Sequence, residues 1–188
     1  VVGNNVARNP REVRSNLAFL TNELKLDEHF TPEYTMSYFG KLHGMADMEI
    51  ENRMTELFNY FGVNAFRKRK ISELSTGMKQ KLSIAVSIVH DPDVVIFDEP
   101  TNGLDIITAR AVTDYLQALR DRGKIVIVST HIMSVAEKLC DHIAIILDGE
   151  IKVAGSLEHI LEESKAKDLE DAFFNIYRQV KGVQTNEK

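Results

Sequence analysis

A run of β-branched and apolar residues in the middle of the chain ends abruptly in two adjacent carboxylates. The run is Val94–Phe97, within the sequence VVIFDEPTNGLD, and Asp98 and Glu99 follow it directly. A continuous apolar run of this length, followed by turn residues, predicts a buried strand. Open α/β sheets bind their ligands at the carboxyl ends of such strands, so the two acids mark a candidate site.

Strands and helices are predicted to alternate after this run. Ile125–Ser129 is a second Val- and Ile-rich segment, and like the first it predicts a strand buried on both faces. An amphipathic helix is predicted between the two strands, over Thr108–Arg122. Asp148 and Gly149 separate two further strand-like segments and predict a tight hairpin. The alternation predicts an α/β fold with a mostly parallel sheet flanked by helices.

The region 31–74 has helical periodicity and no strand-like alternation. Thr31, Pro32 and Glu33 form a strong helix start, because a capping hydroxyl, an early proline and an acidic first turn each suit the unpaired N–H groups there. A second helix is predicted over Asp47–Phe61, where apolar residues recur at spacings of three and four. We expect this region to form a helical lobe of its own.

Charge and composition exclude some classes of partner. The 188-residue chain has a formal net charge of -5, which argues against nonspecific binding of nucleic acid or anionic membranes. Its apolar runs fall far short of the roughly 20 residues that cross a bilayer, so a membrane role requires a partner. Cys140 is the only cysteine, which excludes an intrachain disulfide and fits a reducing cytosol. The basic run Arg67–Lys70 is interpreted as a solvated loop or helix end, with a phosphate or partner contact as the alternative.

Three groups of residues could carry chemistry. In a phosphate-handling site Asp98 would hold Mg²⁺ through water and Glu99 would polarise an attacking water, although a lone Asp-Glu pair at a strand end can also be simply solvated. Ser75 caps a helix expected to run to about His90, and its N-terminus favours a phosphate. His131 follows the strand Ile125–Ser129, so it would lie near the carboxylates if the two strands are neighbours.

Taken in order, these segments resemble the nucleotide-binding domain of ATP-binding cassette (ABC) ATPases. LSTGM resembles the family's signature motif, VVIFDEP its Walker B strand and NGLD its D-loop. His131 resembles the switch histidine, and Asn22 stands where the family has the glutamine of its Q-loop. The resemblance implies an α/β, P-loop NTPase-like fold with a helical subdomain, and it implies ATP and Mg²⁺ as ligands.

The resemblance also implies roles for individual residues. Glu99 and His131 would be catalytic, and Asp98 and Asn22 would hold Mg²⁺ through water. The nucleotide would contact a further set of residues: Ser75, Thr76, Gly77, Met78, Asn22 and Asp105. ATP would lie between the two subunits of a head-to-tail dimer, and transmembrane permease subunits would hold the chain at the cytoplasmic face of the membrane. No nucleic-acid partner is expected.

One family motif is absent from the sequence. Nothing matches the G-x-x-x-x-G-K-[ST] loop that cradles phosphates, and in this family that loop precedes the Q-loop. We therefore expect an N-terminal part to be missing and the isolated chain to be inactive. The expected divisions are a remnant with the Q-loop (1–30), a helical subdomain (31–74), an α/β core (75–165) and a C-terminal helix with tail (166–188).

The sequences of two segments indicate a subfamily. FTPEYTMSYFGKLHGM and LEDAFFNIYR resemble ATPases that power sodium or drug export, or polysaccharide and lipid export. The first hypothesis is therefore the ATP-hydrolysing subunit of an exporter. Two alternatives stay open: an ABC-type ATPase that acts on DNA or ribosomes, and a non-catalytic module that lends its signature face to a complete partner.

Overall fold

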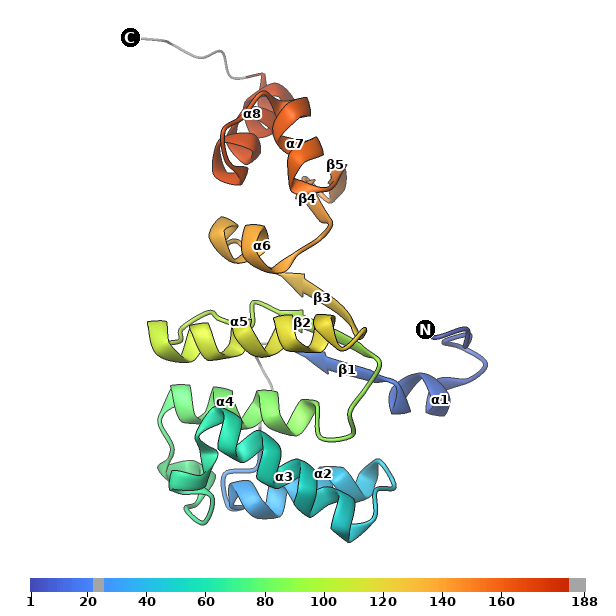
Figure 1. Cartoon of the computed structure of the whole chain (residues 1–188), viewed down its shortest axis with the longest axis vertical. Helices are drawn as coiled ribbons and strands as arrows, with labels where there is room; N and C mark the ends of the chain where they lie inside the picture. Colours follow the sequence, from blue (N-terminus) through green and yellow to red (C-terminus); the bar gives the residue numbers. More distant parts are fainter. Residues whose placement is uncertain (22–25, 183–188) are drawn as a thin grey trace. The chain divides into compact units, whose positions relative to one another are not determined.

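The computed structural model describes residues 1–21 and 26–182 (Figure 1). The chain forms two compact units, Val1–Ser129 and Thr130–Lys188. The elements of the first unit are α1 (Pro10–Ser15), β1 (Leu17–Leu20), α2 (Pro32–Leu42), α3 (Asp47–Phe61), the 3-10 turns η1 (Val63–Phe66) and η2 (Ile71–Glu73), α4 (Thr76–Ser87), β2 (Val94–Asp98), α5 (Ile106–Asp121) and β3 (Ile125–Ser129). Those of the second are α6 (Met133–Leu139), β4 (Ile143–Leu147), β5 (Glu150–Gly155), α7 (Leu157–Ser164) and α8 (Leu169–Lys181).

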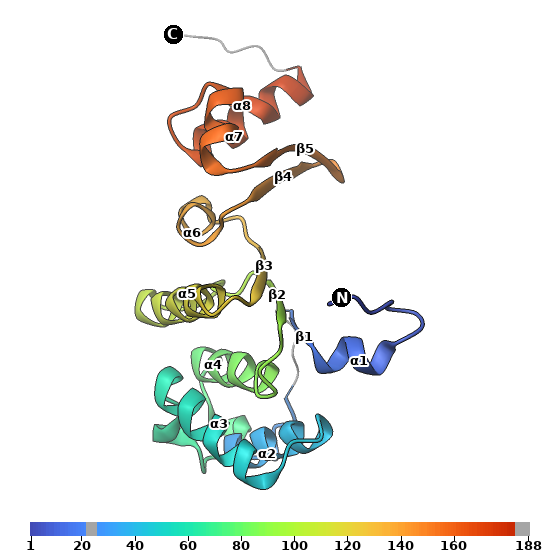
Figure 2. The same ribbon diagram turned by 45° about the vertical axis from the view of Figure 1, so that its right-hand side comes forward.

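A parallel sheet organises the first unit. In the described residues its strands lie in the order β1-β2-β3, so the Walker B-like strand β2 is central. The register aligns Leu20 with Phe97 and Asp98 with Ser129. Figure 2 shows α4 and α5 on the same side of these strands. The predicted parallel sheet with flanking helices is confirmed.

The prediction that both strands are buried on both faces is right for one face of β2, is right only in part for its other face, where Ile96 is half-buried, and is wrong for β3. Val95 and Phe97 of β2 are fully buried, whereas Ile125 and Ile127 of β3 are 57% and 51% exposed. In the register Phe19 on β1 and Ile127 on β3 flank Ile96 of β2, and Phe19 is exposed as well. Apolar composition predicts a strand that can be buried, but the neighbouring elements decide whether it is.

The helices of region 31–74 form as predicted. The hydroxyl of Thr31 accepts a hydrogen bond from the N–H of Tyr34 at the start of α2, and Gly62 ends α3 in the left-handed conformation. No strand occurs in this region, which the structure describes completely. Both helices belong to the first unit. The division of the chain into four parts, with this region as a separate lobe, stays a prediction.

The end of α4 differs from the prediction. The helix was expected to reach His90, but it ends at Ser87. The guanidinium of Arg53 on α3 donates to the carbonyls of Ile88 and Val89 at 3.0 and 3.2 Å. These carbonyls follow the last helical turn, so a side chain from α3 satisfies them instead of water. A contact of this kind between distant segments is invisible in local periodicity.

The second unit consists of a hairpin and three helices. Its strands β4 and β5 pair antiparallel around the predicted Asp148-Gly149 turn. Side chains from the hairpin, α7 and α8 form one core: Ile145, Val153, Ile160, Leu169, Ala172 and Ile176. Among the described residues, no helix is both long and apolar enough to cross a membrane.

Gly40 lets α2 and α3 approach closely, and this contact yields a test of the packing. A methyl group at Gly40 would lie 2.6 Å from the nearest carbon of the buried Ile50 side chain. Gly40→Ala should therefore lower the free energy of unfolding by about 1–3 kcal/mol, although alanine is the better helix former. The matched control is Gly77→Ala on α4, where the added methyl meets nothing within 4 Å and should stabilise by up to about 1 kcal/mol. Equal stability changes in urea titrations would contradict this packing.

Two histidines stack where α2 ends near the end of α4. The rings of His43 and His90 lie 3.6 Å apart, almost parallel at 4°. Burial, followed by the neighbouring His43 ring and by Arg53, lowers the pKa of His90 from 6.5 to about 4, although Asp91 opposes the shift. Burial also lowers the pKa of His43. Both shifts favour the neutral form of the two stacked rings.

The stacked pair should make stability depend on pH. An unfolded His90 binds a proton below about pH 6.5, whereas the folded residue binds one only near pH 4, so the unfolded state gains protons first. The contribution of neutral His90 to the free energy of unfolding should be fully present above about pH 6.5. It should be lost progressively as the pH drops toward 4. His90→Phe should flatten this part of a urea-unfolding pH profile. A profile that His90→Phe leaves unchanged would show that other groups cause the acid sensitivity.

Candidate active site

The site is built at the carboxyl ends of β2 and β3. Asp98 is the last residue of β2, and its partner in the register is Ser129, the last residue of β3. The Ser129 hydroxyl donates a short hydrogen bond to Oδ1 of Asp98. The N–H of Glu99 donates to the carbonyl of Ser129 at 2.9 Å. One serine thus contacts both members of the acidic pair.

Glu99 has an unusual backbone conformation. Its φ is 48°, in the left-handed region that side chains other than glycine adopt at a cost. The chain then turns, because the N–H of Asn102 donates to the carbonyl of Glu99 at 3.1 Å. Asp98 is held at the strand end by Ser129, whereas Glu99 stands at the start of a turn, so the two adjacent carboxylates can serve different atoms. Strain of this kind concentrates at functional sites.

The N-terminus of α4 offers backbone donors to an anion. Ser75 caps the helix, and its hydroxyl accepts from the N–H of Met78 at 3.3 Å. Ser75 and Thr76 are exposed, and the side of Gly77 where a Cβ would lie is open space. Lys79 pairs with Glu28 at 2.7 Å, and this contact lowers the pKa of Glu28. The exposed N–H groups and the helix dipole suit a phosphate.

Asp105 has a structural role in this chain, as the N-cap residue of α5. It caps α5: Oδ1 accepts from the N–H groups of Ile107 and Thr108, both at 3.0 Å, and Oδ2 accepts from the Thr108 hydroxyl at 2.6 Å. The Thr108 contacts lower the pKa of Asp105, and Lys81 of α4 adds a smaller effect in the same direction. The helix therefore begins at Ile106, and the predicted start at Thr108 was two residues late. A role for Asp105 at the nucleotide stays a prediction.

Only some of the predicted site residues belong to the same unit of the structure. Asp98, Glu99, Asp105 and the start of α4 all belong to the first unit. The condition set for His131 is met, since β2 and β3 are neighbours, but His131 itself belongs to the second unit. Its role at a γ-phosphate stays a prediction. Asn22 lies outside the described residues.

The strand ends suit Mg²⁺ through its water shell rather than through an all-protein cage. Within residues 1–21 and 26–182, no cluster of three or more His, Cys, Asp or Glu side chains could hold a metal ion. Oδ1 of Asp98 is occupied by Ser129, whereas Oδ2 has no partner among the described residues. Mg²⁺ keeps several waters and binds through one or two carboxylates together with substrate phosphates. Asp98 therefore fits as a water-mediated ligand of Mg²⁺ bound to a nucleotide.

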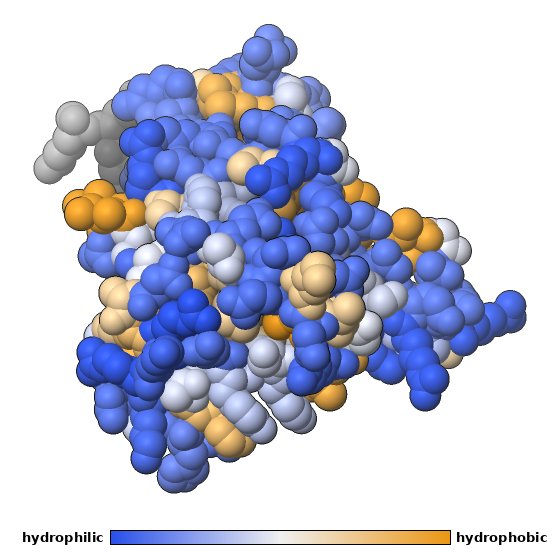
Figure 3. All heavy atoms as spheres, turned by 60° about the horizontal axis from the view of Figure 1, so that its bottom comes forward, coloured by the Kyte–Doolittle hydropathy of each residue, from blue (hydrophilic) through white to orange (hydrophobic). Residues whose placement is uncertain are grey.

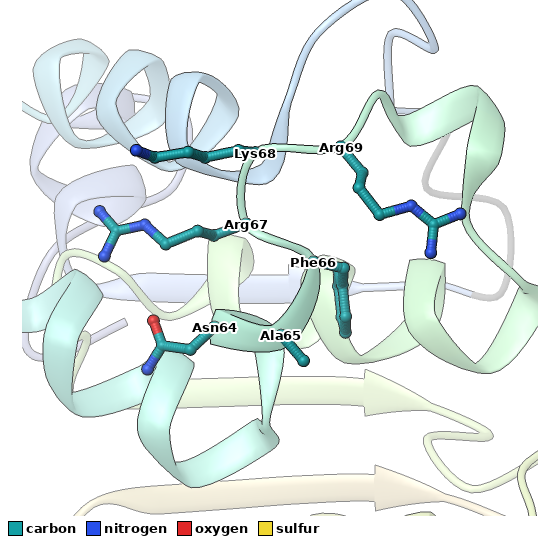
Figure 4. Close-up of a pocket in the computed structure, with 6 residues that line it drawn as sticks. All are labelled: Asn64, Ala65, Phe66, Arg67, Lys68 and Arg69. Atoms are coloured by element: carbon teal, nitrogen blue, oxygen red, sulfur yellow. The ribbon is translucent and has the colours of Figure 1, made fainter.

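The basic run Arg67–Lys70 lies in a loop, as predicted. Residues 64–69 line a hollow of about 340 Å³ (Figure 4). Arg67 pairs with Glu33 at 2.9 Å, and Arg69 donates to the carbonyl of Glu73 at 2.8 Å. In the described part of the chain neither Lys68 nor Lys70 has an ion-pair partner, and both are exposed, as a solvated loop should be.

Exposed apolar side chains gather at the beginning of α5. Ile106 and Ile107, which directly follow Asp105, are 88% and 82% exposed. Elsewhere the surface shown in Figure 3 is mainly hydrophilic, with apolar patches separated from one another. Adjacent isoleucines that remain in water mark a contact surface more clearly than scattered apolar residues do.

The architecture has close structural relatives. The solved structure of an ATP-binding subunit of an ABC transporter superimposes with a TM-score of 0.87 at 26% identity, over 94% of this chain and 75% of that chain. CbiO1 from Clostridium perfringens, described as part of the ABC transporter complex cbiONQ, matches with a TM-score of 0.68 at 22% identity. It covers 82% of this chain and 62% of that one, and it shows the fold alone. The chain has the α/β ABC ATPase fold.

The sequence comparisons assign the family. Residues 2–102 match the family model described as ABC transporter. The ABC transporter ATP-binding protein NatA of Bacillus subtilis is 34% identical, over 97% of this chain and 74% of NatA. The Nod factor export ATP-binding protein I of Burkholderia lata is 34% identical, over 87% of this chain and 53% of that protein. The chain belongs to the ABC transporter family, as an ATP-binding component, and spans about three quarters of one relative and about half of the other.

Sequence reasoning missed the contribution of Ser129. The residue was interpreted only as the end of a strand, because a serine there has no chemistry of its own. A signal was available: parallel strands of equal length place Asp98 and Ser129 side by side. The cap at Asp105 was missed for a different reason. The apolar pattern of α5 drew attention to Thr108, although an aspartate three residues before a threonine is a recognisable helix start.

The strain at Glu99 can be tested by comparing glycine with alanine. Glycine adopts a positive φ freely, whereas alanine does not. Glu99→Gly should therefore be more stable than Glu99→Ala by about 1 kcal/mol in urea titrations. The same pair of substitutions at Glu12, which lies in α1, should show the opposite order, because glycine weakens a helix. An alanine variant at least as stable as the glycine variant at position 99 would exclude backbone strain there.

Proposed function

We propose that the chain is the ATP-binding and hydrolysing component of an ABC exporter. The observation that carries the proposal is the acidic pair at the end of the central strand, with Asp98 held by Ser129 and Glu99 in a left-handed conformation. Two adjacent carboxylates that serve different atoms suit metal-assisted attack of water on a phosphate. Family membership supports ATP as the substrate.

Each residue of the pair would have its own task. Oδ2 of Asp98 would accept a hydrogen bond from a metal-bound water, while Mg²⁺ would neutralise charge on the phosphate oxygens. Glu99 would orient and polarise the attacking water. His131 would contact the γ-phosphate, and Asn22 would assist at the metal. Catalysis would come mainly from positioning and from electrostatic stabilisation.

The start of α4 would serve a nucleotide shared with a second subunit. Ser75, Thr76, Gly77 and Met78 present backbone N–H groups and a hydroxyl, which would meet the phosphates from one side. The sequence contains no G-x-x-x-x-G-K-[ST] loop, so a loop of that kind would have to hold the phosphates from the other side. A head-to-tail pair of ATP-binding subunits supplies this arrangement. The exposed Ile106 and Ile107 beside Asp105 support contact with such a partner.

Export is supported by the names of relatives. Several matched proteins are Nod factor export ATP-binding proteins. The sequences of residues 30–45 and of helix α8 resemble those of sodium, drug, polysaccharide or lipid exporters. Permease subunits would recruit the chain to the cytoplasmic face of the membrane and would select the cargo. The net charge of -5 gives no support to the alternative of acting on DNA or ribosomes.

A second candidate is a non-catalytic module that lends its α4 face to a complete partner. The exposed Ser75 and Thr76 at the start of α4, which can meet a phosphate held by another subunit, support it. The two functions differ in the role of Glu99. A hydrolysing subunit needs the carboxylate, whereas a module that donates only Ser75 and its neighbours does not.

Glu99→Gln separates these functions. The variant should be assayed in a chain extended at its N-terminus with the G-x-x-x-x-G-K-[ST] region of an ABC ATP-binding protein, so that this loop and Glu99 belong to the same subunit of the head-to-tail pair. Hydrolysis should fall at least about 100-fold, because the general base is lost. ATP binding, measured by calorimetry, should stay within about twofold, since an amide keeps the shape of the side chain.

The control is Glu12→Gln, an exposed change on α1 that should leave hydrolysis unaltered. Equal hydrolysis by the Glu99→Gln and unmodified assemblies would refute the catalytic assignment and favour the non-catalytic module.

A further inference from the structure

Ser129 makes two different hydrogen bonds at the site. Its hydroxyl donates to Oδ1 of Asp98, and its carbonyl accepts from the N–H of Glu99 at 2.9 Å. The first bond fixes a side chain and the second fixes a stretch of backbone. Both bonds lie inside the first unit and follow from the alignment of Asp98 with Ser129 in the sheet.

The bond from the hydroxyl removes rotational freedom from an exposed carboxylate. Asp98 is exposed, and a carboxylate at the end of a strand can otherwise occupy several rotamers. With the Ser129 hydroxyl bound to Oδ1, the side chain presents Oδ2 and the second lone pair of Oδ1 in a fixed orientation to a new hydrogen-bond donor. A charge-assisted bond of this kind is among the stronger ones in proteins.

The hydrogen bond accepted by the Ser129 carbonyl fixes the backbone of Glu99. The N–H of Glu99 donates to this carbonyl just where the backbone enters the left-handed region with a φ of 48°. A strained conformation persists only where the surroundings determine it. Pairing with Ser129 ties the strained residue to the neighbouring strand β3.

We propose that Ser129 is a positioning residue, which holds the carboxylate of Asp98 in one rotamer and anchors the backbone of Glu99. The inference rests on the proposed function, because it concerns ATP hydrolysis. Ser129 acts through these two neighbours and does not itself touch the nucleotide. The hydroxyl of the side chain is the part that mutation can remove, because every residue supplies the carbonyl.

Three substitutions separate the hydroxyl from the size of the side chain. Ser129→Thr keeps the hydroxyl and adds a methyl group, Ser129→Val has a methyl group of almost the same size in place of the threonine hydroxyl, and Ser129→Ala removes the hydroxyl. Threonine and valine both suit a strand, so folding should be preserved. Ser87→Ala is the control, because its hydroxyl bonds only the carbonyl of Ile84 on α4.

The first experiment reads the rotamer of Asp98 in the full chain without any ligand. Three-bond NMR couplings across χ1 should report a single rotamer in the unmodified chain, in Ser129→Thr and in Ser87→Ala. The Ser129→Val and Ser129→Ala chains should give averaged couplings. An Asp98 side chain that is already averaged in the unmodified chain, or that stays fixed in Ser129→Val, would overturn the inference.

The second experiment measures hydrolysis in the N-terminally extended chain described for Glu99→Gln. Ser129→Val and Ser129→Ala should lower kcat by about tenfold while the KM for ATP changes less than about twofold, because positioning affects the reacting geometry more than binding. Ser129→Thr should restore kcat. Averaged couplings with an unchanged kcat would overturn the inference but leave the proposed function intact. Hydrolysis that survives Glu99→Gln would overturn the proposed function itself, whatever the Ser129 variants do.

Discussion

Parallel hydrogen bonding between β1, β2 and β3 is the constraint on which the rest of the first unit depends. The pairing places β2 in the centre and aligns its last residue, Asp98, with Ser129 of β3. It also brings together the ends of segments that are far apart in sequence, and the helices α4 and α5 then cover one face of the sheet. The acidic pair therefore owes its position to the register of the strands and not to the sequence around it.

The site combines a rigid strand end with a strained turn. Asp98 is held by a hydroxyl from the next strand, whereas Glu99 leaves the strand in a left-handed conformation and begins the turn that leads to Asp105. Asp105 then caps α5 and fixes where the helix starts. In this way seven residues, Glu99–Asp105, connect the strand to the helix.

Much of the fold could be predicted because its signals are local. The cap at Thr31, the apolar periodicity of 47–61 and the Asp148-Gly149 turn each act within a few residues, and each formed as expected. The prediction failed where contacts between distant segments determine the end of a helix or the burial of a strand. Arg53 on α3 takes up the carbonyls that follow α4, so that helix ends early, and Ile125 and Ile127 of β3 remain exposed.

The sequence by itself determined the elements and the chemical character of the site. Its motifs identify the family, and the types and order of the residues name Asp98, Glu99 and the start of α4 as candidates. Only the tertiary structure decided which hydrogen bonds the acidic residues form. Oδ1 of Asp98 accepts from the Ser129 hydroxyl, and the carboxylate of Asp105 accepts from the first turn of its own helix. The physical reason is that residue type and spacing are local properties, whereas hydrogen-bond partners depend on the register between strands that only packing fixes.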